Sequence, residues 1–553
     1  MELAQQLKER YQHLKQVRAP WETLWGDIAR YVIPRRIPGL GGTVEAPGTA
    51  AEVQLFDNTA VQANMTLANG QLAWMTPMES AWFGFGADDG ADDAKRWLAK
   101  ASKKALKRMS TGNVYTALHE CYLNRSAFGI CALYLERGKK NLLNAQAWPV
   151  GSFVIDEDDE GNVDTVIREF KLTPRQAVQK FGADKVHAKT REAADKGGAK
   201  ALEKETYLHA IYPREERDKA RRDAAHMPIA SVYIHDATGH VCLDSGYEEM
   251  PVFVSRYLEW GSVTGAYYGW SPAFTALPEV RQVNFMQKMM DALGEKMAFP
   301  PVLAPEELEG EIDANAFGVT YFSKDLAGTP PREWMTQGRY DIGLLRVQER
   351  QKAINTAFHV DLFQMFAQVE KQMTAREVAE RASEKLIQFS PTFARLTSEL
   401  LNPMLQRVFG ILLRTGEFGE VPESLRVPVG DGMDYVAPPD LEFQSRMALS
   451  LKALPSIGYQ RTLERLGVVA QLAPDVLDNY NFDAAERETA LNDGVPGDFL
   501  RPIVERDKMR KARAEAEAQA AQQQAMMEEA EMLQKAGSVK ADSLAAKALR
   551  PAA

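Results

Sequence analysis

Apolar residues recur every three to four positions through the N-terminal part of the chain, which is the period of an amphipathic α-helix. The pattern predicts helices at about residues 1–32, 55–75, 91–109 and 114–127. Asp57, Asn58 and Thr59 precede the apolar run of the second helix, and residues of these types often cap helix N-termini. The chain is therefore expected to open as a helical region.

Between about residues 130 and 257 the apolar period shifts towards two, which predicts antiparallel strands joined by polar turns. Two stretches inside this block differ from the rest. Residues 173–204 are expected to form charged helix, and residues 214–223 a solvated loop of mixed charge. The block is therefore interpreted as a strand-rich region with helical insertions.

A helical period returns beyond residue 270. It predicts one long helix over 277–297, stopped by Pro300 and Pro301, and a second, mostly polar helix over 340–358. The proline-rich, acidic insert between them is expected to contain strand, so the two helices form a hairpin that can protrude from the main body. Methionines in the first helix are interpreted as core filler, with pliable contacts to partners as the alternative.

Residues 373–414 show a helix start that is encoded in the sequence. Thr374 and Glu377 have the spacing of a capping box, in which each side chain satisfies a free amide of the first turn. Pro391 then interrupts the apolar stripe, and a second stripe begins at Phe393. We therefore predict a pair of helices packed into a core.

The C-terminal part differs in composition. Residues 416–436 are rich in proline and glycine, and short helices are expected from there to about residue 492. Residues 504–550 consist mainly of Ala, Gln, Glu, Lys and Met, which favours helix but supplies no regular large apolar positions. This tail is either a long exposed helix that like helices of neighbouring subunits support, or partly disordered.

Composition bounds the fold class. A chain of 553 residues with 45% hydrophobic and 26% charged residues has an ordinary globular composition and is too long for one core. We predict an α+β protein that is predominantly α-helical, with three or four structural units. No run reaches the roughly 18 apolar residues of a membrane span, and the N-terminus does not resemble a signal peptide. The three cysteines are scattered, which suits a reducing cytosol.

The net charge of −10 argues against a conventional DNA-binding protein, which needs a basic surplus to neutralise phosphates. It does not exclude a channel for DNA, because a continuous basic lining would hinder sliding. The charge therefore makes tight, sequence-specific binding an unfavoured interpretation.

Motifs for catalysis, cofactors and metals are weak or missing. The sequence has no phosphate-binding GxxxxGK[ST] loop, and the glycines at 84–90 are interpreted as a turn because Asp89 replaces the third glycine of a dinucleotide fingerprint. Residues 156–161 mimic the start of a calcium loop, but Ile167 stands where its last ligand belongs, so an acidic hairpin turn is favoured. We predict no catalytic residues, no cofactor and no metal site.

Other candidate residues have ordinary structural interpretations. His235 and His240 flank a turn without a third ligand nearby in the sequence, so they are interpreted as surface histidines. Ser271 precedes a proline and is a candidate helix N-cap, because the second glycine of a nucleophile elbow is missing. Cys121 and Cys131 are expected to be core thiols.

Several segments, in order, resemble the head-to-tail connecting (portal) proteins of short-tailed bacteriophages. They are LFDNTAVQANMTLANG, FVIDEDDEGNVDTVIREFKLTPRQA, YYGWSPAFTALPEV, FPPVLAP, INTAFHVDLFQMF, MTAREVAER and ELLNPMLQRVFGILLR. The resemblance runs over most of the chain but is less clear beyond about residue 417, and the tail is not diagnostic. It implies a subunit with wing, stem, clip and crown parts in a dodecameric ring at one capsid vertex.

The resemblance also implies a division of the chain. The expected parts are the wing (1–270), first stem helix (271–298), clip (299–338), second stem helix (339–360), tunnel loop (361–373), wing-to-crown connecting helices (374–415), crown (416–500) and C-terminal barrel or tail helix (501–553). A ring of parallel tail helices would give the C-terminal segment the partners that it lacks in a single subunit.

Site residues follow from these assignments as expectations. The residues expected to face DNA in the channel are Gln364, Gln368, Lys371, Gln372 and Arg376, although Lys371 and Arg376 can equally be solvated helix-end charges. Those expected to pair between stem helices of neighbouring subunits are Arg281, Lys288, Asp291, Glu295, Arg346 and Arg350. Those expected on the clip surface for the terminase or the adaptor are Pro305, Glu306, Glu307 and Glu309.

The resemblance further implies partners and a location. The partners are double-stranded DNA in the channel, the terminase large subunit, a tail adaptor protein, and the major capsid and scaffolding proteins, with no membrane. The protein would be assembled in the host cytoplasm and end in the virion at the portal vertex. The alternatives are another virion structural protein, against which the strand-rich block argues, and a nucleic-acid enzyme with an unrecognised site.

Overall fold

The computed structural model describes most of the chain. The described residues are 2–34, 55–86, 92–138, 141–218, 221, 223–261, 268–298, 302–303, 328, 332–333, 340–368, 389–429, 433–445, 448, 454–471, 473–492, 501 and 503–537. The chain divides into two compact units, Met1–Leu451 and Lys452–Ala553. The boundary lies inside the stretch expected to be the crown (416–500).

The helices predicted in the first unit at 1–32, 55–75, 91–109, 114–127, 277–297 and 340–358 are present with bounds close to the expected ones, and the charged stretch 173–204 contains two short helices. The first helix of the pair predicted over 373–414 lies outside the described residues up to residue 388. The helices are α1 (Glu2–Tyr31), α2 (Thr59–Met75), α3 (Asp92–Thr111), α4 (Val114–Phe128), α5 (Pro174–Phe181), α6 (Ala188–Lys196), α7 (Pro272–Ala298), α8 (Tyr340–Ala357), α9 (Val360–Gln368) and α11 (Asn402–Arg414). Asp57 accepts a hydrogen bond from the Thr59 amide at the start of α2, at 2.9 Å. The fold is α+β, as predicted.

The strand-rich block forms two antiparallel sheets, with strand orders β4-β5-β6-β7-β8 and β3-β2-β9. Its strands are β2 (Ile130–Glu136), β3 (Asn144–Trp148), β4 (Phe153–Glu157), β5 (Val163–Leu172), β6 (Glu205–Pro213), β7 (Ile229–His235), β8 (His240–Tyr247) and β9 (Val252–Arg256). The prediction of antiparallel strands is confirmed. The acidic residues at 156–161 span the end of β4 and the turn to β5, where the Asp158 carboxylate accepts hydrogen bonds from the amides of Glu160 and Asn162.

Shorter strands form pairs outside this block. They are β1 (Phe83–Gly86) with β14 (Asp440–Phe443), β10 (Val302–Leu303) with β11 (Arg332–Glu333), and β12 (Arg426–Val429) with β13 (Met433–Val436). The turn expected at the glycines 84–90 is therefore wrong for Gly84 and Gly86, which pair with Glu442 and Asp440. Alternating Phe83 and Phe85 bury one face of this strand, and the glycines occupy the other.

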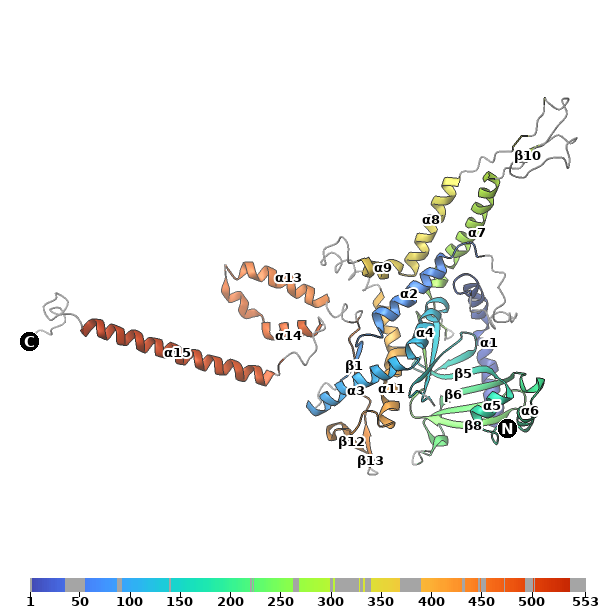
Figure 1. The fold of residues 1–553 in the computed structure, drawn as a ribbon, viewed down its shortest axis with the longest axis horizontal. Coiled ribbons are helices and arrows are strands. Elements are labelled where there is room, and N and C mark those ends of the chain that lie inside the picture. The colour runs from blue at the N-terminus through green and yellow to red at the C-terminus, as the bar shows by residue number, and fades with distance from the viewer. Residues whose placement is uncertain are drawn as a thin grey trace, which may run out of the picture. The chain divides into compact units, whose positions relative to one another are not determined.

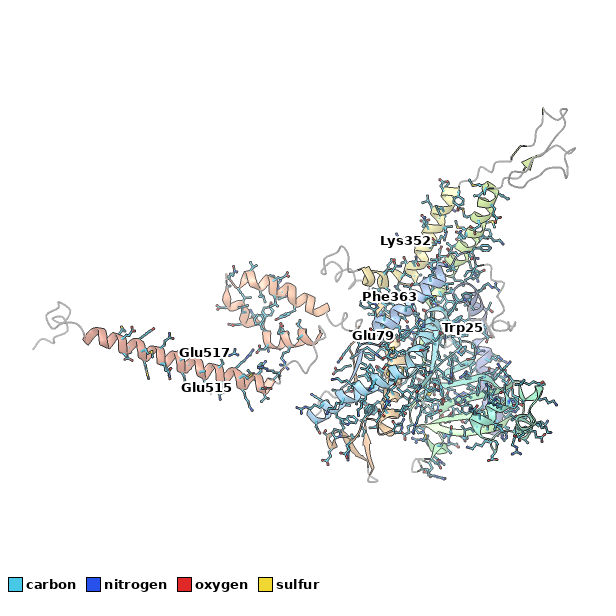
Figure 2. The ribbon with its side chains drawn as sticks, viewed as in Figure 1. Trp25, Glu79, Lys352, Phe363, Glu515 and Glu517 are labelled. Carbon is cyan, nitrogen blue, oxygen red and sulfur yellow. The ribbon has the colours of Figure 1, made fainter. Side chains whose placement is uncertain are left out.

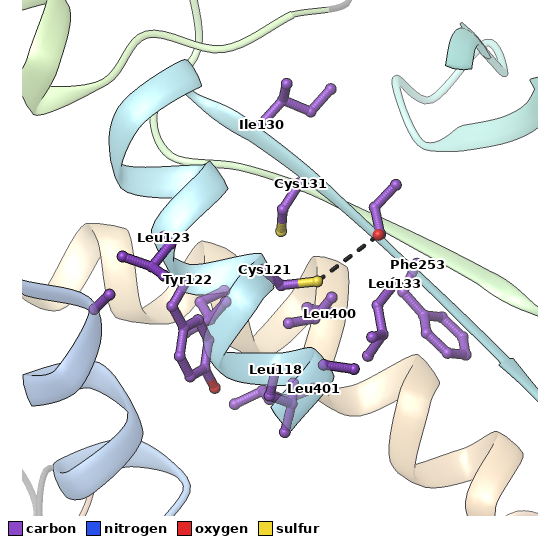
Figure 3. Close-up of a cluster of buried hydrophobic side chains, with 14 of the residues drawn as sticks. Leu118, Cys121, Tyr122, Leu123, Ile130, Cys131, Leu133, Phe253, Leu400 and Leu401 are labelled. Atoms are coloured by element: carbon purple, nitrogen blue, oxygen red, sulfur yellow. Dashed lines mark hydrogen bonds between the residues drawn. The ribbon is translucent and has the colours of Figure 1, made fainter. Parts of the chain in front are cut away.

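The main core surrounds α4, which is buried on nearly every side between α2 and the sheet β3-β2-β9. Figure 3 shows its centre, where Leu118 and Tyr122 of α4 meet Leu133 of β2, Phe253 of β9 and the leucines at 400–401. Cys121 and Cys131 are buried free thiols in this cluster, as predicted. Because apolar neighbours lie all round α4, its apolar residues need not follow one stripe.

A second core joins the first half of α1 to the five-stranded sheet. Leu7, Tyr11 and Leu14 of α1 pack on residues of β4, β5, β6 and β7. The Tyr11 hydroxyl donates to Glu169 at 2.7 Å, and Arg10 pairs with Asp156 at 2.8 Å. The N-terminal helix is therefore fixed to the sheet by an apolar contact with a polar border.

Helical residues 389–396 continue through a π-helical turn, Thr397–Leu401, into α11. Pro391 lies in the first described turn of this stretch. The helix expected before it lies outside the described residues, so the interruption at Pro391 stays a prediction. The capping box at Thr374 and Glu377 lies outside the described residues. A buried face including Phe389, Leu396, Leu400 and Met404 runs along the stretch, as the predicted second stripe requires.

The second unit contains α13 (Leu454–Val469), a 3-10 segment (Pro474–Asn479), α14 (Phe482–Asn492) and α15 (Ile503–Gly537). Asp483 of α14 pairs with Arg510 and Arg506 of α15. Glu515 and Glu517 extend outwards from α15 in Figure 2. Met526, Met527 and Met532 are also exposed. Over 503–537 the tail is a long exposed helix, and its support by like helices of neighbouring subunits stays a prediction.

Candidate interface and channel residues

The hairpin of α7 and α8 extends from the first unit in Figure 1, and its base is fixed by the end of α4. A Cβ on Gly269 would lie 2.5 Å from the Gly129 carbonyl oxygen, so only glycine permits this crossing. Ser271 donates from Oγ to the Ala127 carbonyl at 2.7 Å and accepts from the Phe274 amide at 3.3 Å. The prediction of Ser271 as an N-cap is confirmed, and it orients α7.

The two helices pack through a narrow inner face. Val283 and Met290 of α7 and Val347 and Ile354 of α8 are buried there. Gly343 lies directly against the Met290 side chain, which allows a close approach of the helix axes. The interpretation of the methionines as core filler therefore holds for Met290.

The outer faces of the hairpin carry exposed apolar side chains. Phe285 is 61% exposed and Leu345 is 65% exposed. Others with more than a third of their surface exposed are Met289, Met297, Ile342 and Leu344. The apolar period of the sequence places Met297, Ile342 and Leu345 on the apolar faces of the two helices, and burial of these faces is wrong for all three, which remain exposed. Apolar periodicity cannot tell a face that packs inside the subunit from one that is left in water.

The residues expected to pair between stem helices lie around this apolar surface. Lys288, Asp291, Glu295 and Arg346 are exposed. Lys288 lies over the Phe56 ring at 5.7 Å, and Asp291 accepts from Gln287 at 3.0 Å.

The other two members of that set have ion-pair partners within the chain. Arg281 pairs with Asp27 of α1, and Arg350 pairs with Glu279 of α7. Both pairs fix the lower part of the hairpin, so any contact with a neighbouring subunit would have to share these guanidinium groups.

The expected tunnel loop begins as a helix. His359, with φ of 53°, turns the chain between α8 and α9. Leu362 and Phe363 of α9 are buried, and Figure 2 labels Phe363 where α9 meets α2. A loop is therefore wrong for residues 361–368, because the buried pair Leu362–Phe363 holds this stretch against α2 as helix.

The structure describes only part of the expected channel set. Gln364 is exposed on α9. Gln368 ends α9, and its side chain lies outside the description, as do Lys371, Gln372 and Arg376. In the segment expected to be the clip, β10 pairs with β11, which confirms strand in the insert. Pro305, Glu306, Glu307 and Glu309 lie outside the described residues.

Buried arginines hold the helical stretch that follows the channel segment. Arg125 is fully buried in α4, and it donates to the Arg256 carbonyl at 3.2 Å and to the Thr392 carbonyl at 2.9 Å. Burial lowers the pKa of the Arg125 guanidinium. Arg256 in turn donates to Glu399 of the π-helical turn at 2.9 Å and also pairs with Glu157. These contacts connect residues 392–399 to the sheet and to α4.

Comparison with known proteins decides the family. Residues 4–500 match the bacteriophage head to tail connecting protein family. The chain belongs to this family. It is 30% identical over 551 residues to a probable portal protein of Bordetella phage BPP-1, with 96% of this chain and 95% of the relative covered. It is 28% identical over 537 residues to the portal protein of Salmonella phage epsilon15, with 94% and 93% covered.

Membership confirms the resemblance that the sequence segments indicated. This member of the head-to-tail connecting family functions as a phage portal at the capsid vertex and is part of the virion. Within the described part of the chain, no helix combines the length and the hydropathy that a membrane crossing requires.

The two histidines that flank the turn between β7 and β8 make contacts within this portal subunit. His235 is buried, which corrects its interpretation as a surface histidine; its Nδ1 lies 2.7 Å from Thr238 Oγ1, and its ring lies near His187. His240 lies 3.0 Å from the Lys185 carbonyl through Nε2. The described residues include no group of three or more His, Cys, Asp or Glu that could hold a metal ion.

Proposed function

We propose that this portal assembles into a closed ring, a dodecamer, through which double-stranded DNA enters and leaves the capsid. In this proposal α7 and α8 are the stem, the segment 299–338 is the clip, residues 1–270 form the wing, and residues 416–500 contribute the crown. The α15 helices of neighbouring subunits would associate into a barrel, which would cover the exposed Met526 and Met527.

The exposed apolar surface of the stem hairpin carries this proposal. Phe285 on α7 and Leu344 and Leu345 on α8 leave large apolar areas in water. Large apolar side chains exposed together on one hairpin indicate surfaces that another protein covers. Exposed Lys288, Asp291, Glu295 and Arg346 border them, which gives the apolar centre and polar rim of a typical interface. A second copy of the hairpin would supply apolar side chains to cover the apolar centre and opposite charges to pair with the charged rim.

The test is the native mass of the purified chain, combined with negative-stain images. We expect a ring of about a dozen subunits with a central hole. Leu345→Glu and Phe285→Glu should shift the population to smaller species, because a carboxylate would be desolvated in each interface. Leu202→Glu is the matched control, since Leu202 is 77% exposed and lies away from the hairpin.

Two results would contradict this proposal. A wild-type chain that stays monomeric or dimeric at every concentration and salt has no ring. If both stem variants form rings as well as the wild type does, the exposed apolar side chains of the hairpin do not lie in the contact between subunits.

The proposed partners follow from the same arrangement. The clip, with Pro305, Glu306, Glu307 and Glu309, would dock the terminase large subunit during packaging and a tail adaptor afterwards. The wing would contact major capsid and scaffolding proteins. Gln364, Gln368, Lys371, Gln372 and Arg376 would line the channel as a polar surface of mixed charge that lets DNA slide. The portal itself would carry out no bond chemistry.

A further inference from the structure

Helix α3 is strongly basic although the whole chain carries a net charge of −10. Arg96, Lys100, Lys103 and Lys107 follow one another at spacings of four, three and four residues, so they share one face of the helix. We call these four residues the α3 basic stripe. All four side chains are exposed. From the first to the last of them the helix rises by about 16 Å.

The opposite face fixes which way the stripe points. Ala94, Leu98, Ala101, Ala105 and Met109 of α3 are buried against the core, and α3 contacts α4, α11 and β1. In Figure 1, α3 lies at the edge of the first unit, beside the labels of β12 and β13. The stripe is therefore held outwards on a rigid element.

Two other cations of α3, Lys104 and Arg108, have a partner within the described part of the chain, whereas the four cations of the stripe do not. Arg108 pairs with Glu417, and Lys104 donates to the Glu417 carbonyl at 2.9 Å. Among the residues that the structure describes, the side chains of the stripe have no recorded ion pair or hydrogen bond. Like charges at three- and four-residue spacing destabilise a helix. The stripe thus lowers the stability of α3 and makes no compensating contact within the described chain.

The chemistry of the stripe favours a nucleic-acid backbone over a protein partner. A protein interface has an apolar centre, yet none of the exposed large apolar side chains in the described chain lies on α3. Over about 16 Å of duplex axis the two strands together present about nine phosphates, at one charge for roughly every 1.7 Å. Long cationic side chains on one straight face can reach the phosphates on the side of the duplex that faces α3, without any group that reads a base.

We infer that the α3 basic stripe binds the phosphate backbone of double-stranded DNA independently of sequence. The inference rests on the proposed passage of DNA through the portal, and it assigns a contact surface separate from residues 361–376. Such contacts would be weak individually and would depend on salt, because each cation releases a condensed counterion when it meets a phosphate.

The experiment measures binding of the full chain to a fluorescent 30-base-pair duplex of arbitrary sequence as NaCl is raised. The test variant is R96Q/K100Q/K103Q/K107Q. The matched control is K185Q/K189Q/R191Q/K200Q, which removes four exposed cations near α6 and changes the net charge equally. Each protein is first checked for native mass and for helix content by circular dichroism, so that binding is compared at the same assembly state.

We expect the plot of log affinity against log salt to lose a slope of about 3 to 4 in the stripe variant, at about 0.9 for each phosphate contact. The control variant should retain the wild-type slope. If both variants lose the same amount, net charge alone is responsible, and the inference is overturned.

Two further outcomes separate this inference from its alternatives. Unchanged DNA binding in the stripe variant, together with lost retention on a poly-glutamate column, would make the stripe a docking surface for an acidic protein and would overturn DNA contact. If the stripe variant forms rings of normal mass and its salt slope is unchanged, DNA binding by the stripe is overturned and the proposed portal assembly still stands. Failure of ring assembly in the wild type would instead count against the assembly.

Discussion

Gly70→Ala is expected to disturb the contact that holds α9, the described start of the expected channel segment, against α2. A Cβ at Gly70 would lie 2.5 Å from Cγ and 2.6 Å from Cε1 of Phe363. Carbon atoms normally approach to about 3.5–4.0 Å, so the ring would have to move by about 1 Å. Phe363 is only 6% exposed and also contacts the Phe389 ring, which limits where it can go.

Two opposing effects set the magnitude. In an open helix, replacing glycine by alanine stabilises by about 1 kcal/mol. Overpacking against a buried ring costs about 1–3 kcal/mol. We therefore expect Gly70→Ala to lower the free energy of unfolding by about 0–2 kcal/mol. In a Phe363→Ala background the ring is absent, so the same substitution should raise the free energy of unfolding by about 1 kcal/mol.

The assay is a double-mutant cycle in urea, followed by far-ultraviolet circular dichroism, with hydrogen exchange of peptides from residues 360–368 as a local measure. Gly26→Ala in α1 is the matched control, because a Cβ there has no atom within 4 Å and should only stabilise. Faster exchange in α9 is expected for Gly70→Ala alone. Equal effects of Gly70→Ala in both backgrounds would refute the close approach to Phe363.

Three further substitutions test buried polar groups. Burial holds the pKa of His209 well below its usual range, so below about pH 6.5 the unfolded chain binds a proton that the folded chain does not. The free energy of unfolding should therefore fall by up to about 1.4 kcal/mol for each pH unit below that point. In urea titrations, His209→Gln should flatten this dependence on pH. Glu399→Gln should lower the free energy of unfolding by up to about 3 kcal/mol, because the buried Arg256 guanidinium keeps only one of its two partly buried carboxylates. Ser271→Ala should cost about 1–3 kcal/mol in the same assay, since it removes the cap of α7 and leaves the buried Ala127 carbonyl without its donor.

Each expectation has a contrary result. An unaltered pH slope in His209→Gln would mean that another group binds the proton. Glu399→Gln with wild-type stability would show that Arg256 is satisfied by Glu157 alone. If the Ser271→Ala variant unfolds at the same urea concentration as the wild type, the Ser271 side chain does not stabilise the start of α7.

Local signals in the sequence were sufficient for most elements. The long helices α1, α2 and α7 follow from an apolar period of three to four, because a helix with one buried face must repeat its apolar residues at that spacing. The strand block follows from the period of two, and the Ser271 cap from a serine placed just before a proline. These features depend only on residues that are near one another in the chain.

Other elements needed contacts that local periodicity does not encode. β1 was read as a turn, because its glycines favour turns until β14, far along the chain, pairs with it. α9 was read as loop, although the burial of Leu362 and Phe363 against α2 makes it helical. In each case a distant segment supplies the hydrogen bonds or the apolar surface that outweigh local preference.

The candidate interface divides in the same way. The sequence alone determined the family, the helical hairpin of α7 and α8 and the charges along it, since these depend on residue types and their order. Only the tertiary structure decided that Arg281 and Arg350 already have partners within the chain, and that Phe285 and Leu345 remain in water. Exposure and ion pairing depend on which surfaces meet, and that is fixed when the helices pack together.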